Sequence, residues 1–235
     1  MSTALGIGAG LCWTLAYLLI IRIGLRERTY GMPIVAFASN ISWEFLYAFV
    51  RPSNGVQHVI NIVWFLLDCG IAYTVVRFGP SEFPYISKRV FYGCLAALLA
   101  LAYPAVDLVG TQFDAGDGAF SAFGSNLMMS ALFIAMFTAR PAGRGQSIGI
   151  ATAKLAGTAF ASGSVAVKSD LAARYHGGLL PYLYIACFVL DLVYLGLVLS
   201  VRSIPISSAE GERITGTPTG AGAIFHESAD VDSGR

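Results

Sequence analysis

Charged residues are scarce in this sequence. Only 12% of its 235 residues are Asp, Glu, Lys or Arg, which is about half of the share found in soluble globular domains. The 15 basic and 14 acidic side chains nearly cancel, leaving a formal net charge of +1 at pH 7. The scarcity excludes a water-soluble enzyme and a disordered chain. The balance excludes a nucleic-acid-binding protein, because no basic excess is present to neutralise phosphates.

Several catalytic and metal-binding motifs are missing as well. The four cysteines all fall within apolar segments and form no Cys-x-x-Cys pair, so we expect neither a disulfide framework nor a metal cluster. The absence of His-Glu-x-x-His and Gly-x-Ser-x-Gly argues against the common hydrolases. No Asp-Asp-x-x-Asp run is present to hold a metal for ionising a diphosphate. We therefore expect no metal and no cofactor.

Long apolar segments make up most of the sequence. Hydrophobic residues account for 56% of it, and the mean hydropathy is +0.67. A helix needs about 20 apolar residues to cross a bilayer. The seven segments of about that length are Ala4–Ile21, Pro33–Val50, Val59–Val76, Val90–Val109, Ala122–Ala139, Ile148–Val167 and Pro181–Ser200. The sequence thus predicts an all-α, seven-transmembrane-helix domain over residues 1–202 and a disordered polar tail over 203–235. Small residues at Ala153, Gly157 and Ala161 predict the close approach of a neighbouring helix.

The distribution of Lys and Arg predicts the orientation in the membrane. The loops after the first, third and fifth spans carry eight of these residues, and the loops after the second, fourth and sixth carry three. Cytoplasmic loops carry an excess of Lys and Arg. We therefore predict an outside N-terminus and a cytoplasmic tail in a multi-pass membrane protein. Its membrane would be the cell membrane in a bacterium or the endoplasmic reticulum membrane in a fungus.

Five ionisable side chains lie within the predicted spans: Glu44, Asp68, Asp107, Lys154 and Asp191. Charged groups in hydrocarbon are costly, rare and usually functional. Asp107 lies near the end of its span, and Lys154 is close enough to an end for its long side chain to reach the interface. The other three acids lie deeper, at similar depths that would let them project into one cavity. A structural role, in which an acid hydrogen-bonds a neighbouring helix, stays open for each.

Polar and aromatic side chains flank the three deep acids. They are Asn40, Trp43 and Tyr47 around Glu44, Trp64 before Asp68, and Tyr184 and Tyr194 around Asp191. A buried carboxyl group that keeps its proton can protonate a weak base such as an alkene or an epoxide. Aromatic faces attract cations, so an apolar cavity with such walls could fold a polyene and exclude water. For any single aromatic residue, contact with lipid is the alternative interpretation.

Four stretches resemble the paspaline-type integral-membrane terpene cyclases. These are small seven-helix proteins of fungal indole-diterpene and meroterpenoid pathways, with relatives in bacterial terpenoid-alkaloid pathways. The more specific stretches are Asn40–Tyr47 and Asp191–Tyr194, and Trp64–Asp68 and Ser125–Ser130 add support. The resemblance covers roughly residues 4–200 and not the tail.

The resemblance implies a membrane enzyme that protonates the terminal alkene or epoxide of a prenylated indole, alkaloid or meroterpenoid substrate and closes rings without metal. The family's two essential acids match Glu44 and Asp191, which would be the proton-donating pair, one donating and the other tuning it. Asp68 and Asn126 would be supporting polar groups. The implied partners are the hydrophobic substrate, the lipid bilayer and a pathway prenyltransferase or epoxidase.

A small proton-coupled transporter is the alternative function, since buried acids also relay protons. Such transporters commonly have internal repeats and broken helices, and the sequence has no convincing repeat at a three-helix period. A retinal photoreceptor would need a lysine in its last span, and residues 181–200 contain none.

Overall fold

Helices form every regular element in the described part of the chain, so the predicted all-α class is confirmed. The computed structural model describes residues 2–114, 118–140, 143–167 and 177–202. The elements are α1 (Ser2–Glu27), α2 (Ile34–Phe45), the π-helix η1 (Leu46–Val50), α3 (Val56–Glu82), α4 (Lys88–Phe113), α5 (Ala119–Ala139), α6 (Ile148–Ala166) and α8 (Leu179–Arg202). Since α2 continues directly into η1, these residues contain seven helical segments, as predicted. The predicted tail lies outside the described residues.

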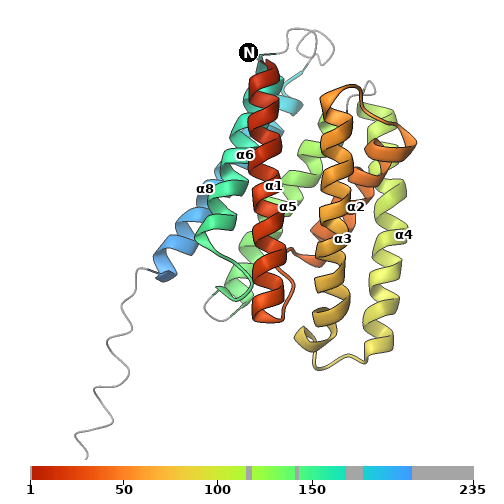
Figure 1. Cartoon of the computed structure of the whole chain (residues 1–235), viewed down its shortest axis with the longest axis vertical. Helices are drawn as coiled ribbons and strands as arrows, with labels where there is room; N and C mark the ends of the chain where they lie inside the picture. The colour runs from red at the N-terminus through yellow and green to blue at the C-terminus, as the bar shows by residue number, and fades with distance from the viewer. Residues whose placement is uncertain (1, 115–117, 141–142, 168–176, 203–235) are drawn as a thin grey trace, which may run out of the picture. The chain divides into compact units, whose positions relative to one another are not determined.

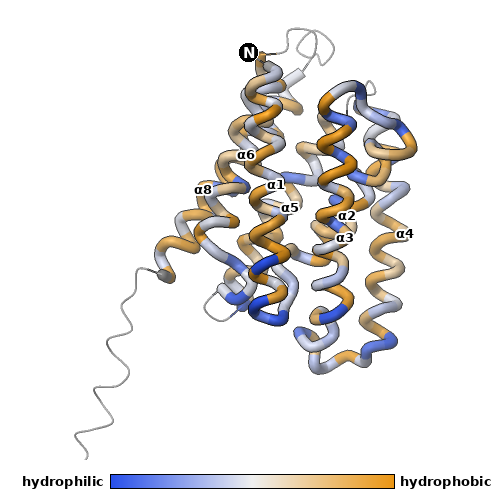
Figure 2. Tube along the Cα trace, in the orientation of Figure 1, coloured by the Kyte–Doolittle hydropathy of each residue, from blue (hydrophilic) through white to orange (hydrophobic). Residues whose placement is uncertain are grey.

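Five helices are long and apolar enough to cross a membrane, namely α1, α3, α4, α5 and α8. The combined α2–η1 segment, Ile34–Val50, is apolar but shorter. Figure 2 shows hydrophobic residues along the middle of the helices and hydrophilic residues gathered toward their ends. This pattern fits a bundle embedded in a bilayer. Which end of the bundle faces the cytoplasm stays a prediction.

Several helices extend beyond the apolar spans that the sequence predicts. α3 continues past Val76 to Glu82, and α4 begins at Lys88 rather than Val90. The length of an apolar run reports the thickness of the hydrocarbon, whereas backbone hydrogen bonding continues into the polar interface until a cap or turn ends it. Ser87 is such a cap, because its hydroxyl oxygen accepts a hydrogen bond of 3.3 Å from the Val90 amide.

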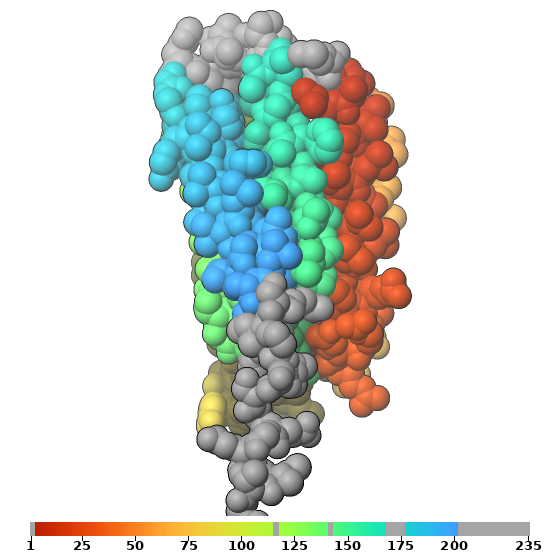
Figure 3. Space-filling view, turned by 90° about the vertical axis from the view of Figure 1, so that its left-hand side faces the viewer, coloured from red at the N-terminus to blue at the C-terminus, as the bar shows by residue number. Residues whose placement is uncertain are grey.

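α2 packs against three other helices, α3, α4 and α5 (Figure 1). On the other side of the bundle, α6 packs against α1 and α8, and the three lie side by side on one face in Figure 3. A Cβ atom at Gly157 of α6 would lie only 2.8 Å from ring atoms of Trp13 on α1. The predicted close approach is therefore confirmed at Gly157, and it brings Trp13 into the interior.

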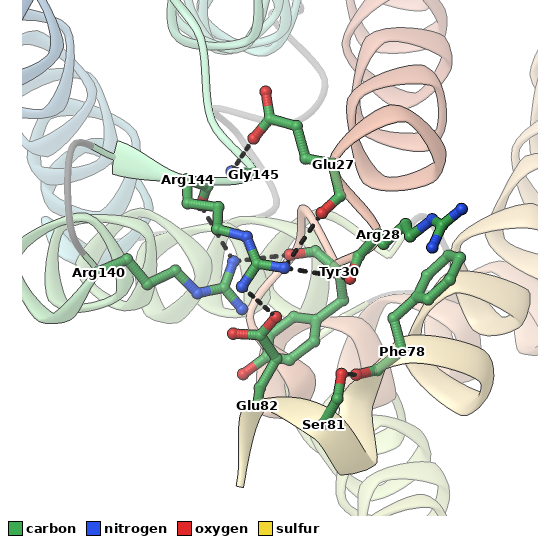
Figure 4. Close-up of polar contacts among 9 residues, drawn as sticks. All are labelled: Glu27, Arg28, Tyr30, Phe78, Ser81, Glu82, Arg140, Arg144 and Gly145. Carbon is green, nitrogen blue, oxygen red and sulfur yellow. Dashed lines mark hydrogen bonds and ion pairs between the residues drawn. The ribbon is translucent and has the colours of Figure 1, made fainter.

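A network of polar contacts holds one end of the bundle together (Figure 4). The Arg144 guanidinium forms a salt bridge of 2.8 Å with Glu82 at the end of α3 and donates a hydrogen bond to the Glu27 carbonyl at the end of α1. Arg140, just after α5, donates to the Tyr30 carbonyl at 2.7 Å and stacks over the Tyr30 ring. The network thus ties α1, α3 and α5 to the loop that leads into α2, which carries Glu44.

Candidate active site

A cavity of about 110 Å³ lies between α1, α2, α3, α5 and α6. Its aromatic wall consists of Trp13, Tyr17, Trp43, Trp64 and Phe123. Its polar lining comes from Asn40, Glu44, Ser125 and Asn126. The site is thus an apolar, aromatic chamber with a few polar groups, which is the usual composition of a small-molecule site.

Glu44 is the only one of the three deep acids in the described lining of this cavity. Its side chain is buried, and the Oε2 atom has no hydrogen-bond partner within the described residues. The Tyr17 hydroxyl lies beside this carboxyl group. Because α2 turns once in 3.6 residues, Asn40 lies on the same face one turn before Glu44, and both side chains reach the cavity.

Asn40 connects Asp68 to this part of the site. Its Nδ2 atom donates hydrogen bonds of 2.7 Å to the Tyr17 hydroxyl and to Oδ2 of Asp68. Asp68 is fully buried, and its Oδ1 atom has no partner within the described residues. The structure therefore groups Glu44, Asp68, Asn40 and Tyr17 at the junction of α1, α2 and α3.

Asp191 lies in a second buried group, on the other side of Asn126. Its Oδ1 atom forms a salt bridge of 2.5 Å with the Lys154 ammonium, and its Oδ2 atom accepts a hydrogen bond of 2.7 Å from the Thr158 hydroxyl. Asn126, which lines the cavity, contacts both Lys154 and Thr158. Asp191 thus reaches the cavity only through intervening side chains, and the catalytic roles of Glu44 and Asp191 stay predictions.

The prediction that Lys154 extends to the membrane interface is wrong. Its side chain is only 1% exposed and points toward α5 and α8, where Ser130 and Asp191 accept its hydrogen bonds. A lysine reaches for the interface when no closer partner can satisfy its ammonium. The partners here come from helices distant in sequence, so the sequence alone could not identify them.

The aromatic residues predicted for the site divide into two groups. Trp43 and Trp64 line the cavity, and their indole nitrogens donate to Ser121 and Thr14 respectively. The three tyrosines lie outside the described lining. Tyr47 packs against Trp43 with ring centroids 4.5 Å apart, Tyr184 packs against Phe123, and Tyr194 is buried against Phe133. Each of these tyrosines supports the wall or the core from behind.

Sequence reasoning missed Trp13 and Tyr17 of α1, although both line the cavity. The two residues are four positions apart, so they share one face of the helix. An aromatic pair at this spacing in the first span was the available signal. Thr158 of α6 was missed as well, and it follows Lys154 by the same four-residue spacing.

Comparison with known proteins gives this site a family context. The sequence model of the Pyr4-like transmembrane terpene cyclases matches residues 1–203. The Pyr4-family terpene cyclase mfmH of Annulohypoxylon moriforme is 32% identical over 159 residues, which are 65% of this chain and 65% of that protein. No solved structure matches the chain.

Two further relatives extend this similarity. Terpene cyclase ascF of Acremonium egyptiacum is 37% identical over 39% of this chain and 34% of that protein. Terpene cyclase pyr4 of Aspergillus fumigatus is 28% identical over 82% of this chain and 83% of that protein. The matches therefore span less than two thirds of mfmH and about one third of ascF.

Proposed function

The chain belongs to the Pyr4-like transmembrane terpene cyclases, and from this premise we propose that it cyclises a prenylated small molecule inside the bilayer. In this proposal the end of the prenyl chain enters the aromatic cavity, where a carboxylic acid protonates its terminal alkene or epoxide. The family membership and the apolar helices make it a multi-pass membrane protein, so a hydrophobic substrate can reach the site from the lipid.

The observation that carries the proposal is the position of Glu44. It is a buried carboxyl group in an aromatic wall, and one of its oxygens has no partner within the described residues. An unpaired carboxylate is costly in such surroundings, whereas a carboxylic acid carries no charge. The unpartnered oxygen can therefore carry the proton and present it to the substrate. We assign the donor role to Glu44.

The reaction balances without a cofactor. The Glu44 carboxyl O–H bond breaks, and its proton adds to the CH carbon of the terminal alkene or to the epoxide oxygen. In the epoxide, the bond from this oxygen to the more substituted carbon then breaks and leaves a hydroxyl group. The tertiary carbocation that forms at the neighbouring carbon is attacked by the next alkene of the chain, which closes a ring. The final cation loses a proton to the Glu44 carboxylate or to water. The product is then an isomer of the substrate.

The cavity wall suits the intermediates of such a reaction. The indole rings of Trp13, Trp43 and Trp64 and the phenol of Tyr17 surround the chamber. The faces of such rings attract positive charge, and a water-excluding wall prevents premature capture of a carbocation. These rings would hold the folded chain while charge moves along it.

The surroundings of Asp191 do not favour the transporter alternative. A proton-coupled transporter needs acids that can exchange protons with an aqueous path, whereas both oxygens of Asp191 are engaged by neighbouring side chains. The relatives reported above are all named as terpene cyclases.

The test uses membranes that contain the full-length protein, with a farnesylated indole and its terminal epoxide as probes. The expected result is a cyclic product with the mass of the substrate. Glu44→Gln should lower turnover by about 1,000-fold, because general acid catalysis commonly contributes a factor of about 100 to 10,000. Asp107→Asn is the matched control, since Asp107 is partly exposed and paired with Arg51.

Two results would contradict this proposal. One is normal turnover by Glu44→Gln at equal protein abundance. The other is label that crosses sealed vesicles unchanged, with a dependence on the pH gradient, which would indicate transport.

A further inference from the structure

Lys154 is a buried cation whose three hydrogen-bond donors all have partners. Its Nζ atom lies 2.5 Å from Oδ1 of Asp191, 2.6 Å from the Ser130 hydroxyl and 3.1 Å from Oδ1 of Asn126. Only 1% of the side chain is exposed. An ammonium group has three protons to donate and accepts none, so the group is fully satisfied in one orientation.

The partners of Lys154 close into a ring of hydrogen bonds. Thr158, one turn further along α6, donates to Oδ2 of Asp191 at 2.7 Å. The same hydroxyl oxygen accepts a hydrogen bond of 3.2 Å from Nδ2 of Asn126. Lys154 therefore contacts the oxygen of the Asn126 amide and Thr158 contacts its nitrogen. Asp191 of α8 in turn accepts hydrogen bonds from both Lys154 and Thr158.

This ring determines which way the Asn126 amide faces. Because an ammonium only donates, the Asn126 atom that faces Lys154 must be the carbonyl oxygen. Because the Thr158 proton is directed to Asp191, the Asn126 atom that faces Thr158 must be the amide nitrogen. Removing either charge would remove the reason for this orientation.

Lys154 touches two parts of the cavity wall without lining the cavity. Asn126 and Trp13 both line it, and the Lys154 ammonium lies 5.3 Å from the centroid of the Trp13 ring. Trp13 is also confined by the close approach at Gly157. The part of the wall formed by Trp13 and Asn126 is thus supported from behind by the charge pair.

We propose that Lys154 and Asp191 form a positioning pair, which fixes the Asn126 amide and the Trp13 ring at the cavity wall for the cyclisation. The inference rests on the proposed function, and it gives Glu44 and Asp191 different roles. Glu44 is the proton donor at the cavity, whereas Asp191 acts through Lys154, Thr158 and Asn126.

A purely structural role for the pair makes a different prediction. Replacing a buried ion pair by apolar residues of similar volume is often neutral or stabilising for folding. If the pair served folding alone, a double apolar replacement would restore both stability and activity. If the pair instead positions the cavity wall, the double variant would be stable but its turnover would stay low.

The decisive variant is therefore Lys154→Met combined with Asp191→Leu, compared with each single change. We expect each single variant to have a lower thermal midpoint in detergent and the double variant to recover most of it. In the double variant, kcat should nevertheless fall by about 100-fold, as expected when a reacting group is displaced by about 1 Å. KM should change by less than about threefold, because the fixed wall matters most in the transition state.

The variant Asn126→Ala tests whether the charge pair affects kcat through the Asn126 side chain at the cavity wall. It should lower kcat by a similar factor in the wild-type protein and add almost nothing in the Lys154→Met and Asp191→Leu background, because residues that act as a unit are not additive. Ser162→Ala is the matched control on α6, since among the described residues its hydroxyl bonds only to the Thr158 carbonyl of its own helix.

A second route keeps the charges in case the double variant fails to fold. Thr158→Val preserves the shape of the side chain but removes both of its hydrogen bonds, and Thr158→Ser keeps the hydroxyl. We expect Thr158→Val to lower kcat by about tenfold and Thr158→Ser to restore it.

Wild-type kcat in a folded double variant, in Asn126→Ala or in Thr158→Val would overturn the positioning pair. Those outcomes leave the cyclase proposal intact, which Glu44→Gln tests separately.

Discussion

Asn40 hydrogen-bonds Asp68, with its amide nitrogen 2.7 Å from the Oδ2 atom of the acid. The same nitrogen contacts the Tyr17 hydroxyl, so one amide on α2 joins side chains from α1 and α3 beside Glu44. Amide hydrogen bonds to buried groups are costly to leave unmade. The position of the proposed proton donor therefore depends on contacts from three helices.

Replacing Asn40 by Leu should damage both stability and catalysis. The change keeps the approximate shape but leaves the Asp68 carboxyl group and the Tyr17 hydroxyl without this partner. We expect a loss of about 1–3 kcal/mol in stability and a fall in kcat of about 10-fold to 100-fold. Thermal unfolding in detergent and turnover per folded molecule measure the two effects.

Thr74→Val is the control for that measurement. Thr74 is buried in α3, but within the part of the chain that the structure describes its hydroxyl bonds only to the Ile71 carbonyl of the same helix. Its kcat should match the wild type. Full activity in Asn40→Leu would show that the network around Asp68 does not position Glu44.

Cyclisation in heavy water should label the product. If Glu44 transfers a solvent-derived proton to the CH carbon of the terminal alkene, each product molecule made from an alkene substrate gains one deuterium at that carbon. With the terminal epoxide as substrate, the transferred proton goes to oxygen, and this carbon gains none. Mass spectrometry and NMR of the isolated products locate the label. Product from the alkene without carbon-bound deuterium in the first turnover of protein equilibrated in heavy water would rule out protonation as the first step.

Gly157→Ala should disturb the cavity through Trp13. The added methyl group would lie 2.8 Å from the Trp13 Cδ1 and Nε1 atoms, and overpacking of this kind costs about 1–3 kcal/mol. Because Trp13 lines the cavity, we expect lower turnover and a changed ratio of cyclic products. Chromatography of the products from equal amounts of folded protein measures both.

Gly163→Ala on the same helix is the matched comparison. A methyl group there would lie 3.6 Å from the Leu5 Cδ1 atom, which is ordinary contact. Its product profile should equal the wild type. Equal changes in turnover and product ratio in the two variants would mean that the higher helix propensity of alanine, and not the contact with Trp13, causes them.

Arg144→Gln should affect stability and spare the chemistry. The change removes the salt bridge to Glu82 and the hydrogen bond to the Glu27 carbonyl at the end of the bundle (Figure 4). Since the Arg144 side chain is 45% exposed, we expect a loss of about 1 kcal/mol, seen as a lower thermal midpoint. Turnover per folded molecule should stay unchanged.

Arg26→Gln serves as its comparison, because Arg26 is 70% exposed and its one ion-pair partner among the described residues is its sequence neighbour Glu27. Its thermal midpoint should be that of the wild type. A large loss of turnover in Arg144→Gln at full stability would mean that this end of the bundle takes part in catalysis.

The sequence predicted the fold class and several of the residues that line the cavity. Apolar run length reports the hydrocarbon thickness directly, so seven helical segments could be predicted from composition and spacing. The placement of Asn40, Trp43 and Glu44 near one another followed from their spacing within one helix, whereas Trp64 reaches the same cavity from another helix. These predictions needed only information that is local in the chain.

Tertiary structure alone decided which side chains meet across helices. Lys154 and Asp191 are 37 positions apart, and Tyr17 meets Asn40 from another helix. Periodicity states which face of a helix a residue occupies, but not which helix covers that face. Because a buried charge depends on its partner for its energy, the sequence could locate the deep acids, and only the packing of α1, α5, α6 and α8 could give them different surroundings.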